Sequence, residues 1–313
     1  MPDSAEPIIH TSKLTRHFGA VRAVEDLDLS VPAGSIFGFL GPNGAGKTTT
    51  IRLLLGIVDA TRGDARVFGL SVAHESAVIR HRCGVVLEYS GLYERLAVRE
   101  NLEFQRRSHG LSRALGDERI CMLLDRFGLW EWRDRSAGTL SRGMKQKLAV
   151  ARAMLTKPAL VFLDEPTNGL DPESSRDLRD HILELARDES VTFFLTTHQL
   201  AEVERMCSHI GVLRAGRLRS IGDLDCLRSF GGDRHVRFVG HGFSDDLVAL
   251  LEARAEILYV RRTSDTLNVF LQDQGPVAPL VTLLVSNGVA LEAVVPVVPT
   301  LESGYLALMD ESK

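Results

Sequence analysis

The stretch GPNGAGKT, residues 41–48, decides the fold. It fits the pattern G-x-x-x-x-G-K-[ST] and lies between an apolar run that predicts a buried strand, IFGFLGP (36–42), and one that predicts a helix, KTTTIRLLLGI (47–57). Glycines let backbone N–H groups turn toward phosphate oxygens, and the N-terminus of the following helix adds partial positive charge. The sequence therefore predicts a phosphate-binding loop between a strand and a helix.

This loop predicts a ligand with β- and γ-phosphates and Mg²⁺ as cofactor. Lys47 can reach the β- and γ-phosphates, and the hydroxyl of Thr48 can ligate the metal. The alternative is an ordinary glycine turn before a helix. Such a turn does not require a buried strand before it as well as a helix after it, so the two flanking elements favour the phosphate-binding loop. The nucleotide-binding residues predicted in the loop are Gly41, Pro42, Asn43, Gly44, Ala45, Gly46, Lys47, Thr48 and Thr49.

A second apolar run, ALVFLDEP (159–166), ends in two carboxylates. A strand that delivers an aspartate to the carboxyl edge of the sheet is the usual partner of a phosphate loop. We expect Asp164 to hold magnesium and Glu165 to polarise the attacking water as a general base. Taken alone the run could be an acidic turn, but the phosphate loop favours the catalytic interpretation.

Apolar runs alternate with amphipathic stretches along the first two thirds of the chain. This alternation predicts an α/β domain with a largely parallel sheet over residues 1–225, with a helical part at about 90–157. Further strands are expected at 83–88 and 191–198, and helices around 98–108, 117–127, 141–155 and 172–186.

The pattern changes after about residue 222. The expected order is βαββαβ, which is that of a ferredoxin-like α+β unit. We expect an accessory domain at 226–313, as a binding module or as an inert packing or dimer-contact domain. Its expected elements are 235–240, 244–253, 255–262, 266–272, 276–288 and 289–298, followed by a helix at 300–310.

Composition narrows the classes of function. The net charge of −4 gives no global basic field for nucleic acid, and the four scattered cysteines form no CxxC pair that would indicate a zinc site or a disulfide framework. No apolar run approaches the roughly 18 residues of a membrane span. We therefore expect any role at a membrane to depend on a partner.

Several further motifs in the same order make the chain resemble the ATP-binding subunits of ABC transporters, from residue 8 to about 222. A shorter stretch, TLESGYLALMD (300–310), is similar to the tail of ATPases that pair with drug- and polyketide-exporting permeases. The motifs are LTRHFGAVRAV (14–24) at the adenine-stacking segment, VVLEYSGLYERLAVRENL (85–102) at the Q-loop, TLSRGMKQ (139–146) at the signature, NGLDP (168–172) at the D-loop and TTH (196–198) at the switch histidine.

The resemblance implies an ABC-type ATPase domain with a helical signature subdomain, working as a Mg²⁺-dependent ATPase. It implies a head-to-tail homodimer, in which each ATP lies between one phosphate loop and the partner's signature. It also implies a separate transmembrane permease, with this subunit in the cytoplasm, peripheral on the cytoplasmic face of the plasma membrane. This subunit would contact the membrane only through that permease, and it would not bind nucleic acid directly.

The resemblance also implies roles for single residues. Phe18 would stack on adenine, with Val24 lining the pocket, and Asp171 would link the two ATP sites. His198 would contact the γ-phosphate and hold Glu165 in place. The residues that would bind the γ-phosphate across the dimer interface are Ser141, Arg142 and Gly143.

Glu88 departs from the family, which usually has glutamine at this position. A carboxylate keeps the side-chain length and the metal-ligating oxygen, but it adds negative charge and loses the NH₂ donor. We count Glu88 as a catalytic and metal-binding residue that tunes hydrolysis or coupling. A weakened site and an exposed loop residue remain alternatives. The signature departs too, because Arg142 replaces a glycine and Met144 a glutamine.

The expected function is therefore ATP hydrolysis that powers export of a drug-like or hydrophobic compound. Two alternatives stay open: a soluble ABC-type ATPase acting on ribosomes or DNA, and a non-hydrolysing, nucleotide-gated dimerisation scaffold. The single set of motifs and the negative charge count against the first. Glu165 and His198 count against the second, whereas Glu88 and Arg142 keep it open.

Overall fold

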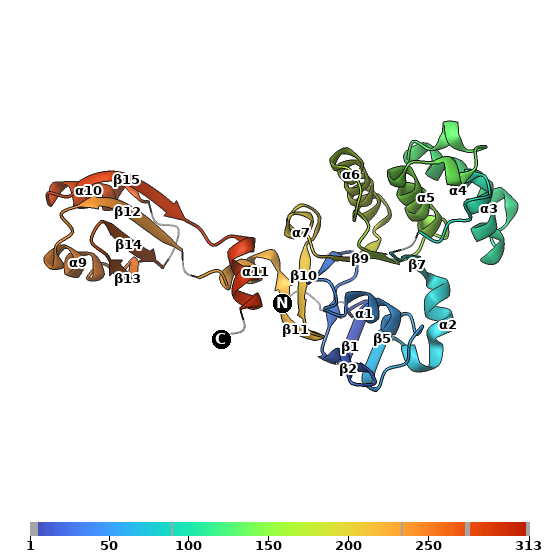
Figure 1. The fold of residues 1–313 in the computed structure, drawn as a ribbon, viewed down its shortest axis with the longest axis horizontal. Coiled ribbons are helices and arrows are strands. Elements are labelled where there is room, and N and C mark those ends of the chain that lie inside the picture. Colours follow the sequence, from blue (N-terminus) through green and yellow to red (C-terminus); the bar gives the residue numbers. More distant parts are fainter. Residues whose placement is uncertain (1–5, 89, 233, 273–275, 311–313) are drawn as a thin grey trace. The chain divides into compact units, whose positions relative to one another are not determined.

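The computed structural model describes residues 6–88, 90–232, 234–272 and 276–310. The chain forms two compact units, Met1–Leu224 and Asp225–Lys313 (Figure 1). Tyr89, which belongs to the segment around Glu88, lies outside the described residues.

A mostly parallel sheet runs through the first unit. Its central strands are buried along their whole length, because their apolar residues face covered surfaces on both sides. Only the edge strand β11 runs antiparallel to its neighbour. The strands, in spatial order, are β11 (Arg217–Asp223), β10 (His209–Arg214), β4 (Ile36–Leu40), β9 (Thr192–Thr197), β8 (Leu160–Asp164) and β7 (Cys83–Val86).

A second, antiparallel sheet belongs to the same unit, and the sequence analysis did not predict it. Its strands contain many polar and exposed residues, such as RGDARV in β5, so they lack the apolar signal of the central strands. The order is β2 (Val21–Leu27), β1 (Ile9–Phe18), β5 (Arg62–Val67) and β6 (Leu70–Ser71), with β3 (Ser30–Val31) paired to β1.

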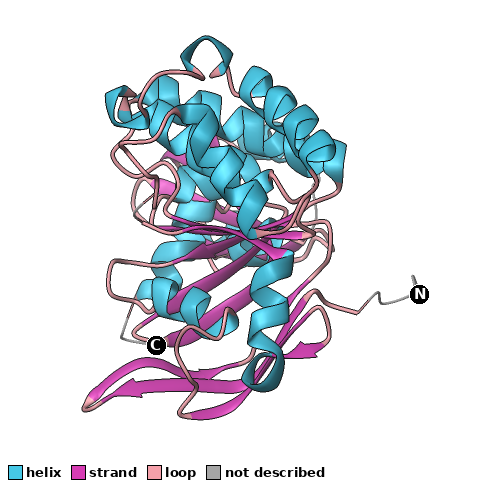
Figure 2. Cartoon of the chain, turned by 90° about the vertical axis from the view of Figure 1, so that its right-hand side faces the viewer, coloured by secondary structure: helices cyan, strands magenta, loops and turns pink. Residues whose placement is uncertain are grey.

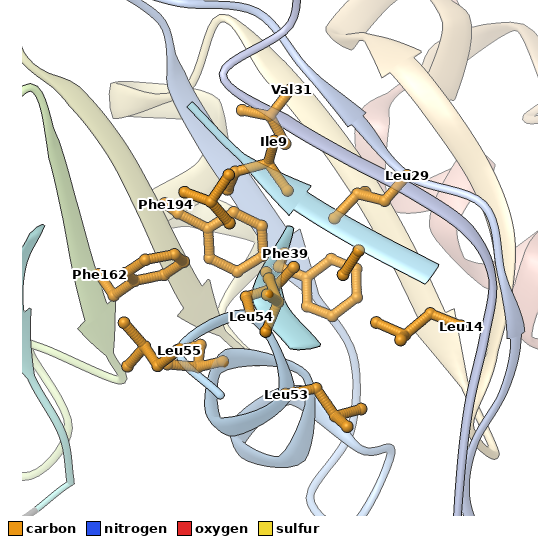
Figure 3. Close-up of a cluster of buried hydrophobic side chains, with 14 of the residues drawn as sticks. Ile9, Leu14, Leu29, Val31, Phe39, Leu53, Leu54, Leu55, Phe162 and Phe194 are labelled. Atoms are coloured by element: carbon orange, nitrogen blue, oxygen red, sulfur yellow. The ribbon is translucent and has the colours of Figure 1, made fainter. Parts of the chain in front are cut away.

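The hydrophobic core of this unit joins the two sheets through α1 (Lys47–Leu54). Leu53 and Leu54 of the helix pack in the same cluster as Phe39, Phe162 and Phe194 of the parallel sheet (Figure 3). The cluster also takes in apolar side chains of β1 and β3 from the antiparallel sheet. The helix that follows the phosphate loop is thus fixed by packing on both sides.

Most helices of the first unit lie on the side of the parallel sheet away from the antiparallel sheet (Figures 1 and 2). The α3, α4 and α5 helices gather there, as expected for a helical part. Ser141 and Asp171 cap the N-termini of α5 and α6 with their side chains. The bounds are α2 (Val72–Arg82), α3 (Val98–Ser108), α4 (Arg113–Arg126), α5 (Arg142–Met154), α6 (Pro172–Glu189) and α7 (Leu200–Met206), with short 3-10 turns at Trp130–Trp132 and Ala137–Thr139.

The second unit contains a four-stranded antiparallel sheet whose elements follow the order βαββαβ. Alternate residues of β12, Val236 and Phe238, are buried in a core that also includes residues of α9 and α10. The spatial order is β13 (Ile257–Arg262), β14 (Thr266–Leu271), β12 (His235–His241) and β15 (Ala290–Val297); the helices are α8 (Leu224–Ser229), α9 (Asp245–Glu252), α10 (Ala278–Ser286) and α11 (Leu301–Met309).

Candidate functional site

The phosphate loop joins β4 to α1, as predicted. Gly46 caps the helix with φ of +107°, and a Cβ there would lie 2.2 Å from the carbonyl oxygen of Ala23. Only glycine fits this position, because a side chain would meet rigid backbone. Nζ of Lys47 donates hydrogen bonds to the carbonyl oxygens of Gly41 (2.7 Å) and Pro42 (3.2 Å). The ammonium is therefore held by backbone carbonyl oxygens of the phosphate loop.

Asp164 ends strand β8 and is buried. The hydroxyl of Thr196 donates to Oδ1 of Asp164 at 2.5 Å. Among the described residues, the buried Oδ2 has no hydrogen-bond partner. A buried carboxylate oxygen without a partner is costly, and hard cations such as Mg²⁺ take oxygen ligands. Asp164 therefore fits the metal-binding role predicted for it.

Glu165 follows the strand in the left-handed backbone region, with φ of +50°. Both oxygens of its carboxylate have partners: Oε1 lies 3.0 Å from Nζ of Lys47, and Oε2 lies 2.7 Å from Nδ1 of His198. Left-handed conformations of residues other than glycine are strained, and they are frequent at active sites. The backbone turn aims this carboxylate at the phosphate loop.

A pocket of about 360 Å³ brings most of these groups together. The residues predicted at sequence level that line it come from the phosphate loop, the acidic strand end and Glu88. They are Asn43, Gly44, Gly46, Lys47, Thr48, Thr49, Glu88, Asp164 and Glu165. All three residues predicted to bind magnesium are among them, although no group of three His, Cys, Asp or Glu side chains within the described ranges is placed to hold a metal by itself.

Four further residues line the pocket, and sequence reasoning had not assigned them to it: Val21, Arg22, Ala23 and Asn168. The first three come from β2, in the antiparallel sheet that the sequence analysis missed. Asn168 lies inside the NGLDP motif, in which Asp171 is the residue with a predicted role. A signal for Asn168 was thus present. The motif at 14–24 marked the start of β2 as well, but it pointed to Val24 and not to the three residues before it, which line the pocket.

The residues predicted to contact adenine are placed differently from those predicted to bind phosphate. Val24 is 0% exposed and belongs to the core, while its neighbours Arg22 and Ala23 line the pocket. Phe18 is 44% exposed, and the guanidinium of Arg16 lies over its ring at 4.4 Å. Stacking of Phe18 on adenine stays a prediction.

The signature residues lie at the start of α5. The hydroxyl of Ser141 accepts from the backbone N–H of Met144 at 3.3 Å, and Gly143 packs against Ser174. The guanidinium of Arg142 donates to the carbonyl oxygen of Asn168 at 2.8 Å. This arginine thus connects the signature to the loop that follows Glu165.

Asp171 caps α6 by accepting from the backbone N–H of Ser174 at 2.9 Å. Hydrogen bonds from Ser174 hold the pKa of this carboxyl below its usual range, so it stays ionised. The described lining of the pocket includes neither Asp171 nor Ser141, Arg142 and Gly143.

Comparisons with known proteins agree with this arrangement. A family model described as "ABC transporter" matches residues 24–168, and one described as "AAA domain, putative AbiEii toxin, Type IV TA system" matches residues 133–204. The bacitracin transport ATP-binding protein BcrA of Bacillus licheniformis is 34% identical over 304 residues, which are 96% of this chain and 97% of that protein.

The daunorubicin/doxorubicin resistance ATP-binding protein DrrA of Streptomyces peucetius is 40% identical over 258 residues, covering 82% of this chain and 78% of that one. A solved structure, titled as that of an ATP binding subunit of an ABC transporter, superposes with a TM-score of 0.65 at 32% identity, covering 71% of this chain and 92% of that one. The predicted P-loop ATPase fold is thereby confirmed. None of the helices formed by the described residues combines the length and apolar character needed to span a bilayer.

Proposed function

The chain belongs to the ATP-binding subunits of ABC transporters, which hydrolyse ATP to drive transport, and on this premise we propose that ATP is hydrolysed in the pocket around Lys47. The observation that carries the proposal is a chain of contacts. Lys47 contacts Glu165, Glu165 contacts His198, and the buried Asp164 lies next to Glu165. Lys47, Glu165 and Asp164 thus line one cavity, and His198 joins them through its contact with Glu165.

In this proposal the loop amides and Lys47 bind the phosphates. Glu165 takes a proton from the attacking water as the water oxygen bonds to the γ-phosphorus. The bond from that phosphorus to the bridging oxygen breaks, and ADP and phosphate are released. His198 holds the carboxylate of Glu165 in place through the 2.7 Å contact.

Mg²⁺ fits the same site. Thr48, Asp164 and Glu88 would hold it, since all three line the pocket and Asp164 has a buried oxygen without a partner in the described part of the chain. When bound, the metal would neutralise charge on the β- and γ-phosphates. Glu88 would place an additional carboxylate beside it and tune hydrolysis.

The proposed dimer is head-to-tail. The signature residues Ser141, Arg142 and Gly143 stand at the N-terminus of a helix of 13 residues, which suits an anion, and they are outside the described lining of their own pocket. This supports their binding the γ-phosphate of a second copy, with Asp171 linking the two sites. Phe18 would stack on adenine.

The proposed process is export of an antibiotic or another drug-like compound through a separate permease. Its support is what the names of two relatives state: bacitracin transport for BcrA and daunorubicin/doxorubicin resistance for DrrA. The subunit would sit peripherally on the cytoplasmic face of the plasma membrane. Because these relatives are transport and resistance proteins, we do not propose action on ribosomes or DNA.

The proposed domain boundary lies at about residue 225. The division of the structure between Leu224 and Asp225 supports it. The ferredoxin-like accessory domain at 226–313 would then be an appendage of the ATPase, as a binding module or a dimer contact.

The test combines hydrolysis with capture of the partner. The wild-type protein should release phosphate from Mg-ATP, and Glu165→Gln should form a stable dimer with ATP while losing hydrolysis. Equal, negligible rates in both would support the non-hydrolysing scaffold instead. From detergent-solubilised native membranes, the trapped variant should co-purify with a multi-pass membrane protein in equal amount. Recovery of ribosomes or DNA would contradict the transport proposal.

A further inference from the structure

Glu202, in α7, carries a buried carboxylate next to the candidate site. The mechanism proposed above gives this residue no role. It is 4% exposed. The hydroxyl of Thr197 donates to Oε2 at 2.7 Å, and the hydroxyl of Thr167 donates to Oε1. Among the described residues, no lysine, arginine or histidine forms an ion pair with it. Because burial of a polar group without hydrogen bonds is costly, these two hydroxyl donors offset much of the cost of burying this side chain.

The two threonines belong to different catalytic segments. Thr167 lies two residues after Glu165, in a turn where the backbone N–H of Asn168 donates to the carbonyl oxygen of Glu165 at 3.1 Å. Thr197 directly precedes His198, and its hydroxyl also accepts from the backbone N–H of Gln199 at 3.0 Å. One carboxylate therefore holds the segment of the base and the segment of the switch histidine together.

The same two segments meet again at the 2.7 Å contact between Glu165 and His198. The two segments are thus fixed at two places, by the contact between Glu165 and His198 and by the hydrogen bonds to Glu202. A shift of about 1 Å in a catalytic group can lower a rate by about a hundredfold. The hydrogen bonds of Glu202 can prevent such a shift of Glu165 or His198, because they hold the neighbouring threonines. Glu202 itself does not line the described pocket.

We infer that Glu202 is a positioning residue for hydrolysis, which holds His198 against Glu165 through the hydroxyls of Thr197 and Thr167. The inference rests on the roles proposed above for Glu165 and His198. It adds a group that touches neither nucleotide nor metal and acts on the turnover step, not on nucleotide binding.

Two substitutions separate the contributions of the two acceptor oxygens of Glu202. Glu202→Gln keeps the shape but has one acceptor oxygen, so one threonine loses its acceptor; Glu202→Ala removes both acceptors. The expected fall in kcat is about tenfold for the glutamine variant and about a hundredfold for alanine. KM for ATP should stay within about twofold, because the phosphate loop is untouched. Thr197→Val combined with Glu202→Gln should cost less than the product of the two single effects.

Glu189→Gln is the matched control. Glu189 is also a largely buried carboxylate of this unit, but it pairs with Arg119 at 2.6 Å and is outside the described pocket lining. Its substitution should lower the melting temperature and leave kcat and KM unchanged. If Glu202 were only structural, its variants would behave in the same way.

A second readout does not depend on hydrolysis. The ring-proton NMR signals of His198, assigned with a His198→Gln variant, should shift in Glu202→Gln and Glu202→Ala without nucleotide, and should not shift in Glu189→Gln. Unchanged His198 signals, or Glu202 variants with wild-type kcat, would overturn the inference.

The two proposals fail differently. Wild-type hydrolysis no faster than that of Glu165→Gln would defeat the hydrolysis proposal, and the NMR signals would still decide whether Glu202 positions His198. Wild-type hydrolysis above that of Glu165→Gln, with no effect of the Glu202 variants, would defeat only the inference about Glu202.

Discussion

Nζ of Lys47 lies 3.0 Å from Oε1 of Glu165, and the two side chains are only 6% and 14% exposed. Attraction between opposite charges is stronger in such a shielded place than at an open surface. In the proposed complex with ATP, the ammonium would exchange this carboxylate for phosphate oxygens. The ion pair therefore competes with the nucleotide that the pocket is proposed to bind.

Glu165→Gln should consequently bind ATP more tightly and hydrolyse it more slowly. Loss of the competing charge, worth about 1 kcal/mol for a modest ion pair, corresponds to roughly fivefold tighter binding. Loss of the base should lower the rate by more than about a hundredfold. Nucleotide titration and phosphate release measure the two effects. Glu94→Gln, which breaks an exposed pair with Lys145, should change neither, and weaker ATP binding by Glu165→Gln would contradict the competition.

Glu88→Gln should keep hydrolysis within about tenfold of wild type, a barrier change of about 1.4 kcal/mol. The side chain lines the pocket, and the amide retains one oxygen that can ligate a metal. Removal of its negative charge should raise the Mg²⁺ concentration needed for half-maximal rate. A complete loss of hydrolysis at saturating Mg²⁺ would instead show that the carboxylate is essential.

Gly46→Ala should abolish ATP binding, whereas Gly44→Ala should weaken it moderately. Both glycines have positive φ, +107° and +78°, but only at Gly46 would the new Cβ meet a backbone atom, the carbonyl oxygen of Ala23 at 2.2 Å. At Gly44 nothing lies within 4 Å, so the cost is the conformational strain of about 1–2 kcal/mol alone. Binding of a non-hydrolysable ATP analogue measures both. Equal losses would show that the contact with Ala23 is unimportant.

Glu25 should make stability depend on pH. Hydrogen bonds from His17 (2.8 Å) and Arg62 (2.7 Å) hold the pKa of its carboxyl below the ordinary value of 4.5. Its contribution is therefore complete above that ordinary value and is lost as the pH falls through the lower pKa of the folded state. The difference in Tm between wild type and Glu25→Gln should have its full size at about pH 6 and should shrink below about pH 4. The same difference at both pH values would be the contrary result.

The sequence by itself determined the local parts of this protein. The phosphate loop and the acidic strand end depend on residues within a few positions of one another, because local backbone turns fix both. The buried central strands were equally predictable, because they are apolar along their whole length. Motif order identified the family, and the comparisons confirm it.

Only the tertiary structure decided which distant segments meet. The antiparallel sheet was not predicted, because its strands contain few apolar residues. For the same reason, the placement of Ala23 at the pocket and of Val24 in the core was not predicted. The contacts of Glu202 with Thr167, 35 residues away, and of Arg142 with Asn168, 26 residues away, arise only when the sheet aligns its strand ends. Such contacts depend on packing between elements, and no local pattern in the sequence encodes them.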